Sequence, residues 1–180
     1  MKMIYTLRLI ILFFIGSLSA CGQSNKNSSN KLNSIDKIEE ITPKGWVNDF
    51  ENIFNEEQKQ TLANLISNFE KETSIEICII TVDTSMTINQ NFNDYVLEIG
   101  RQWGVGKKEK NNGIVIGFSK SYRQIRISNG YGIEKLISDS ETKVVMDEYF
   151  IKNFKQNKYY EGTFEGTIAM MNLLRTKIKK

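Results

Sequence analysis

The residues best suited to chemistry lie in or near two polar, glycine-containing stretches, residues 104–112 and 129–134. Among the side-chain oxygens there, we single out those of Asn111, Asn112, Glu134 and Asp139. Carboxylate, amide and backbone carbonyl oxygens together suit a hard cation such as calcium. Because calcium affinity rises with the charge of the ligands, two carboxylates and neutral amides predict loose binding.

An expected β-hairpin brings the two polar stretches together. Residues 113–119 form an apolar run typical of a buried strand, and residues 122–128 alternate between polar side chains and the apolar Ile125 and Ile127. Two strands joined by so short a turn pair antiparallel. The stretches that flank the hairpin must therefore lie at the same end of the sheet.

The residues that the chain lacks exclude several chemistries. It has no histidine, which excludes Ser-His-Asp and Cys-His catalysis, histidine-ligated zinc and a histidine general base. Its two cysteines, Cys21 and Cys78, cannot form a zinc site of four thiolates. Cys78 lies in an apolar run without the glycine-rich anion loop of a cysteine phosphatase, so we interpret it as a small buried hydrophobic residue.

The remaining elements predict an α/β fold. Residues 75–82 are β-branched or apolar at nearly every position, which is typical of a central strand covered on both faces. Asn55 and Ser138 each begin a capping box, and Asn91 is expected to cap the helix between the first and second strong strands. A right-handed strand–helix–strand crossover then makes residues 75–82 and 113–119 parallel. The predicted architecture is a three-layer α/β/α sandwich with a mixed sheet.

Two C-terminal helices complete this prediction. In the helix that starts at Ser138, four side chains are expected to point into the core: Val144, Val145, Ile151 and Phe154. A last helix, from about residue 160 to residue 178, shows Phe164, Ile168, Met171 and Leu174 at helical spacing. Gly162 and Gly166 leave one side of this helix bare, which favours close packing against another element.

The N-terminal segment, residues 1–20, predicts a lipoprotein signal peptide. Lys2 and Arg8 supply its positive charge, and residues 9–15 form an apolar core too short to span a bilayer. The sequence Leu18-Ser19-Ala20-Cys21 resembles the lipobox of bacterial lipoproteins, which implies a diacylglyceryl group on Cys21 and cleavage before it. An ordinary secretory signal with a chance cysteine is the alternative. A cysteine that carries more than one acyl chain is stably anchored.

Residues 21–44 are expected to be the lipidated cysteine and a flexible tether, with the folded domain at residues 45–180. The tether is rich in Gly, Gln, Ser, Asn and Lys, which cannot bury a core. Gly22 follows Cys21 and no acidic run comes after it; resemblance to other lipoproteins then favours the periplasmic side of the outer membrane.

Charge limits the partners that we expect. Removing Lys2 and Arg8 from the 24 basic residues leaves 22, against 21 acidic ones. This near balance argues against a nucleic-acid partner. We expect a monomer that contacts the membrane through the lipid on Cys21 and docks on another envelope protein.

The order of the polar elements carries a family resemblance over about residues 45–174. These elements are Val47-Asn48-Asp49, Trp103-Gly104-Val105-Gly106, Lys110-Asn111-Asn112-Gly113 and Gly130-Tyr131-Gly132-Ile133-Glu134, followed by Asp139. Together they resemble the TPM domain, an extracytoplasmic module shared by thylakoid-lumen phosphatase-like proteins and many bacterial envelope proteins. The resemblance implies an α/β/α sandwich, acid phosphatase activity in some members and calcium binding in others.

Carried over residue by residue, the resemblance adds Asp49 to the predicted metal ligands Asn111, Asn112, Glu134 and Asp139. Asp49 reaches the other four only if residues 46–50 run back toward their end of the sheet. The family usually has aspartate where this chain has Asn111, so the lost charge weakens the expected site.

Two functions from different classes remain open. The preferred one is a lipid-anchored periplasmic module that binds calcium and docks on an envelope protein. The alternative is a metal-dependent acid phosphatase for phosphomonoesters, in which the metal activates water and Arg101, Lys107 or Arg126 contacts the phosphoryl oxygens. A loosely held, poorly Lewis-acidic ion places the enzyme second.

The same residues also have a simpler, purely structural interpretation. Asn112-Gly113 and Asn129-Gly130 are common turn dipeptides that need no ligand. Asp139 suits the first turn of any helix because of the helix dipole.

Overall fold

The computed structural model describes residues 41–178. The predicted signal peptide, Cys21 and most of the predicted tether lie outside these residues. Within them, no helix is long and apolar enough to cross a membrane.

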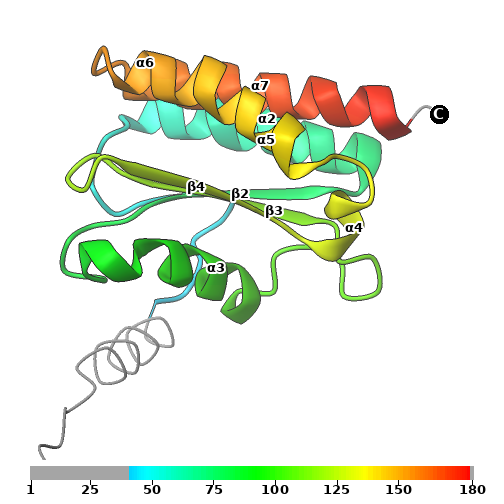
Figure 1. The fold of residues 1–180 in the computed structure, drawn as a ribbon, viewed down its shortest axis with the longest axis horizontal. Coiled ribbons are helices and arrows are strands. Elements are labelled where there is room, and N and C mark those ends of the chain that lie inside the picture. The colour runs from blue at the N-terminus through cyan, green and yellow to red at the C-terminus, as the bar shows by residue number, and fades with distance from the viewer. Residues whose placement is uncertain (1–40, 179–180) are drawn as a thin grey trace, which may run out of the picture.

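The described chain forms an α/β/α sandwich, as predicted (Figure 1). Its strands are β1 (Val47–Asp49), β2 (Glu76–Thr81), β3 (Gly113–Ser119) and β4 (Gln124–Asn129). Its helices are α2 (Glu56–Thr73), α3 (Phe92–Gln102), α4 (Tyr131–Glu134), α5 (Asp139–Val145), α6 (Lys152–Phe154) and α7 (Tyr159–Ile178). Figure 1 shows α3 on one face of the sheet and α2, α5, α6 and α7 on the other.

The sheet has the order β1-β2-β3-β4. β1 runs parallel to β2, and β2 runs parallel to β3, so the amino ends of these three strands lie at the same end of the sheet. β4 pairs antiparallel with β3, which confirms the predicted hairpin. The end of the sheet that holds the β3–β4 turn is called here the hairpin end, and the opposite end is called the loop end. The loop end holds the amino ends of β2 and β3 and the carboxyl end of β4.

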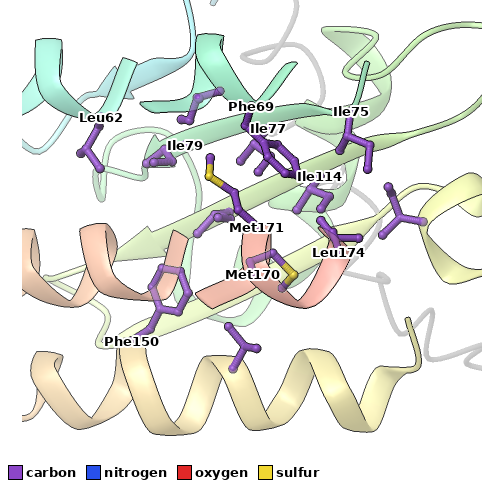
Figure 2. Close-up of a cluster of buried hydrophobic side chains, with 14 of the residues drawn as sticks. Leu62, Phe69, Ile75, Ile77, Ile79, Ile114, Phe150, Met170, Met171 and Leu174 are labelled. Atoms are coloured by element: carbon purple, nitrogen blue, oxygen red, sulfur yellow. The ribbon is translucent and has the colours of Figure 1, made fainter. Parts of the chain in front are cut away.

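Apolar side chains fill both spaces between the layers. In Figure 2, Met170, Met171 and Leu174 of α7 face Ile77 and Ile114 of the central strands. A second cluster packs α3 against the opposite face of β2 and β3. Helices thus cover both faces of β2 and β3, which explains why nearly every residue of these two strands is apolar.

The two capping boxes are confirmed. The Asn55 side chain accepts a hydrogen bond from the Gln58 amide at 2.8 Å, and the Ser138 hydroxyl accepts one from the Glu141 amide at 3.2 Å. The prediction that the Asn91 side chain caps α3 is wrong, because this side chain makes no capping hydrogen bond. A 3₁₀ turn, η1 (Asn89–Asn91), leads directly into α3 instead.

The helix after Ser138 departs from the predicted pattern of burial. Val145 is buried, but Val144 is 59% exposed, so the prediction that Val144 points inward is wrong. The helix continues as a π-helical segment, η2 (Met146–Ile151), whose wider turns shift the phase of the side chains. Phe150 is consequently the residue of this segment that is fully buried.

The bare side of α7 is also confirmed. A Cβ atom at Gly166 would overlap the ring of Phe150, and one at Gly162 would lie 2.9 Å from the ring of Phe154. These two glycines let α7 approach η2 and α6 closely, because no side chain separates the helices.

Candidate functional site

Two loops meet in backbone contact at the loop end of the sheet. The Gly130 amide donates to the Gly113 carbonyl at 2.8 Å, and the Gly132 amide donates to the Asn111 carbonyl at 2.9 Å. A Cβ atom at Gly132 would overlap the carbonyl oxygen of Lys110. The prediction that both glycine-containing stretches share one end of the sheet is confirmed.

Lys107 and Asn112 hold residues 104–112 in place. The ammonium of Lys107 pairs with Glu70 at 2.8 Å and with Glu76 at 2.6 Å. Hydrogen bonds to these two carboxylates raise the pKa of Lys107. The buried Asn112 side chain accepts a hydrogen bond from the Lys107 amide and donates one to the Ser74 carbonyl. Both side chains thus tie the loop to α2 and β2.

Two cavities flank β4 at this end. One, of about 620 Å³, lies on the α3 side, and the other, of about 400 Å³, reaches α5 and η2. Five residues line both cavities: Leu97, Arg126, Ser128, Asn129 and Glu134. Asn111 lines the first and Asp139 lines the second. Of the predicted ligands, Asp139 therefore lines one cavity, Asn111 lines the neighbouring one and Glu134 lines both, whereas Asn112 lines neither.

Three residues at the second cavity carry side-chain oxygens without a hydrogen-bond or ion-pair partner among the described residues. In the described part of the chain, the carboxylates of Glu134 and Asp139 form no ion pair or side-chain hydrogen bond. Asn129 donates from Nδ2 to Thr142 at 2.9 Å, but its Oδ1 is buried without a partner. A buried acceptor left without a donor or a cation is unfavourable, so this oxygen requires a partner such as a water molecule or a cation.

Sequence reasoning missed Asn129, because Asn129-Gly130 has the form of an ordinary turn dipeptide. The one sequence feature that pointed to Asn129 was its position at the end of the second hairpin strand, beside the polar stretch. Between residues 41 and 178, no three His, Cys, Asp or Glu side chains gather where they could hold a metal ion. The donor set is therefore two carboxylates and one amide oxygen.

Arg126 is the cation best placed for an anion at this site. It lines both cavities, and its Nε donates to the Ser128 hydroxyl at 2.8 Å. Among the described residues, it forms no ion pair. Arg101 also lines the α3-side cavity and pairs with Glu98 at 3.5 Å. Lys107, the third predicted anion contact, is held by its two glutamates instead.

Asp49 lies at the opposite end of the sheet. Since β1 runs parallel to β2, Asp49 is level with Thr81 and hence with Phe118, five residues from Gly113, or roughly 17 Å along the strand. Its carboxylate accepts hydrogen bonds from the Ile53 amide, the Phe54 amide and the Thr81 hydroxyl at 3.1, 2.8 and 2.7 Å. Asp49 is thus separated from the other predicted ligands and caps a backbone turn.

Cys78 is buried, as predicted. It is 3% exposed, and burial raises its pKa to about 12. The thiol is therefore protonated at neutral pH, which removes it as a nucleophile.

The fold and this site define a small α/β/α domain with an open mixed sheet and a polar loop end. The model of the TPM domain matches residues 47–173, and the chain belongs to this family. No curated protein matches the chain significantly.

Similar solved structures come from several bacteria. The N-terminal domain of a P. gingivalis protein is 23% identical, with a TM-score of 0.67, over 81% of this chain and 90% of that one. The BA42 protein of Bizionia argentinensis is 19% identical, with a TM-score of 0.58, over 71% and 86%. An N-terminal domain from Corynebacterium glutamicum is 11% identical, with a TM-score of 0.54, over 74% and 80%. At these identities, the likeness shows the fold alone.

Replacing Asp49 tests its structural role. Asp49→Ala leaves two amides and one hydroxyl without their acceptor, so we expect the free energy of unfolding to fall by about 2–4 kcal/mol. The matched change Asp139→Ala removes only an exposed first-turn carboxylate and should lower it by less than about 1 kcal/mol. Urea denaturation compares the two variants; equal losses would contradict the assignment.

Proposed function

We propose that this protein is a lipid-anchored module of the cell envelope that binds a divalent cation, calcium by its donor chemistry, and docks on a protein partner. The buried, unpartnered Oδ1 of Asn129 carries the calcium part of this proposal. Asn129 lines the same cavity as Glu134 and Asp139. A cation would satisfy this acceptor and balance the two negative charges together.

The chemistry of the donors favours calcium over softer metals. Carboxylate and amide oxygens suit hard cations, whereas the described part of the chain offers no thiolate or imidazole at this place. Asn112 is not among the proposed side-chain ligands, because its amide already bridges Lys107 and Ser74. Two carboxylates give a low ligand charge, so we expect weak, millimolar-range affinity. Bound calcium would order the loop end by linking α4 to α5.

Anchoring and location rest on the sequence. The lipobox at residues 18–21 supports a lipid on Cys21, and Gly22 supports the periplasmic side of the outer membrane. Such an anchor leaves the domain facing the envelope space.

Acid phosphatase activity on phosphomonoesters has less support. Of the three cations expected to contact a phosphoryl group, Lys107 is neutralised by Glu70 and Glu76. Arg126 alone combines a place in both cavities with a lack of acidic partners among the described residues. One arginine provides limited stabilisation of a transition-state charge compared with several convergent donors.

Calcium titration tests the proposed metal site. Adding calcium to the purified full-length chain in detergent should raise the melting temperature and shift the amide resonances of residues 129–139. Glu134→Gln and Asp139→Asn should each weaken calcium binding about tenfold, because each removes one of two ligand charges.

Asp147→Asn is the matched control. Asp147 lies in η2, directly after α5, and its carboxylate pairs with Lys143 at 2.6 Å. It should leave the calcium response unchanged. A flat response of the original chain up to several millimolar calcium would remove the metal site from the proposal.

A phosphatase assay separates the two functions. We expect no turnover of p-nitrophenyl phosphate above background, with or without calcium, because the cations are dispersed. Calcium-dependent turnover that Asp139→Asn abolishes would establish the enzyme instead, whereas turnover unaffected by either change would indicate a contaminant.

Replacing the lipid acceptor tests the anchor. Cys21→Ser should move the chain from the membrane fraction to the soluble fraction or leave an uncleaved precursor, because lipidation requires the thiol. Mass spectrometry of the original chain should find the acyl mass on Cys21; an unmodified N-terminus would contradict lipid anchoring.

A further inference from the structure

β4 is an edge strand whose free side is open. The Gly130–Gly113 hydrogen bond fixes the alternation of the antiparallel ladder, so Arg126 and Ser128 direct their backbone groups toward β3. The amides and carbonyls of Ile125, Ile127 and Asn129 therefore point away from the sheet. In the described part of the chain, these outward groups have no hydrogen-bond partner. Unpaired groups of this kind are a template for another strand.

This edge is recessed between two walls. All residues of β4 are partly buried rather than exposed. The cavity of about 400 Å³ extends across the edge, from Leu97 of α3 to Thr142 of α5 and Met146 of η2. Side chains of α3, α5 and η2 on the two sides of the edge leave more room for a single extended chain than for the edge of a second folded sheet. The recess therefore favours a peptide segment over a second copy of this domain.

The charge on the α3 side of the edge selects an acidic segment. Arg126 projects there from the strand and forms no ion pair with the described residues. The lining of the α3-side cavity contains three cations, Arg101, Lys108 and Arg126, and one acid, Glu134. An acidic side chain opposite Arg126 would gain a charge-assisted hydrogen bond in a partly desolvated place.

The two faces of β4 also differ in polarity. Ile125 and Ile127 face the apolar cluster under α7, whereas Arg126 and Ser128 face α3. A strand added beside β4 would alternate in the same way, with apolar residues next to the isoleucines and the acid next to Arg126.

We propose that the β4 edge binds an extended acidic peptide segment of a protein partner by strand addition, with its carboxylate on Arg126. Backbone hydrogen bonds to Ile125, Ile127 and Asn129 supply affinity, and the alternating side chains supply specificity. The inference rests on the docking part of the proposed function and does not require calcium.

Amide hydrogen exchange of the free chain gives the first test. The amides of Ile125, Ile127 and Asn129 should exchange quickly, while those of Arg126 and Ser128 should be protected by β3. Protection of all five amides in the free chain would show a closed edge and overturn the proposal.

The second test uses a random nonapeptide library displayed on phage and panned on the full-length chain in detergent and EDTA. We expect selected peptides rich in β-formers, with Asp or Glu at one fixed position. Two synthetic versions of a selected peptide would be N-methylated, one at the odd-numbered and one at the even-numbered backbone nitrogens. Only one of the two versions should lose binding, because only every second amide of an added strand faces β4. If no peptide is selected, or if both methylated versions lose affinity equally, strand addition would be overturned.

Arg126→Gln should weaken the selected peptide about tenfold or more, through loss of the charged partner. Arg123→Gln is the matched control, because Arg123 is an exposed arginine on the same hairpin that lines neither cavity; it should bind as the original chain does. Equal affinity in the Arg126 variant would contradict the acidic segment. Because EDTA is present throughout, these outcomes are independent of the calcium titration.

Discussion

The close backbone contact between the two loops at the loop end is the constraint on which the site depends. Gly130 and Gly132 lie against the carbonyls of Asn111 and Lys110 so closely that a side chain at either position would overlap them. Only glycine permits such an approach. The contact fixes where β4 ends and α4 begins, and hence where Glu134 stands relative to Asn129. Lys107 and its two glutamates hold the other partner of the contact in place.

The polar groups at the two ends of the sheet have different roles. At the hairpin end, Asp49 caps a turn, and Glu51 accepts hydrogen bonds from Ser119, Lys120 and Ser121. Ligands of open α/β sheets commonly bind at the carboxyl ends of parallel strands. In this domain those ends are occupied by internal caps. Asn129, Glu134 and Asp139 lie toward the amino ends, and Arg126 lies between the two ends, level with Gly117. The proposed metal site therefore lies at the opposite end of the sheet from that common arrangement.

Local signals in the sequence predicted much of this structure. The hairpin, the central strand and the capping boxes at Asn55 and Ser138 each depend on residues close together in the chain, so pattern and spacing sufficed. The burial of Val144 was predicted wrongly, because the pattern assumed a regular helix and the π-helical segment changes the phase.

Features set by distant residues could not be predicted in the same way. The pairing of Lys107 with Glu70 and Glu76 depends on where three separate elements meet. The orphaned oxygen of Asn129 becomes visible only once its neighbours are placed. The position of Asp49 depended on the direction of a three-residue strand, which composition does not fix.

The point at which the chain enters the domain limits how far the β4 edge can lie from residue 21. Trp103 donates from its indole nitrogen to the Ile41 carbonyl at 2.8 Å, which fastens the start of the described chain beside the last turn of α3, at the loop end. Between Cys21 and Ile41 a fully stretched backbone covers at most roughly 70 Å. With a lipid on Cys21, the proposed peptide site on β4 would therefore stay within this reach of the bilayer surface.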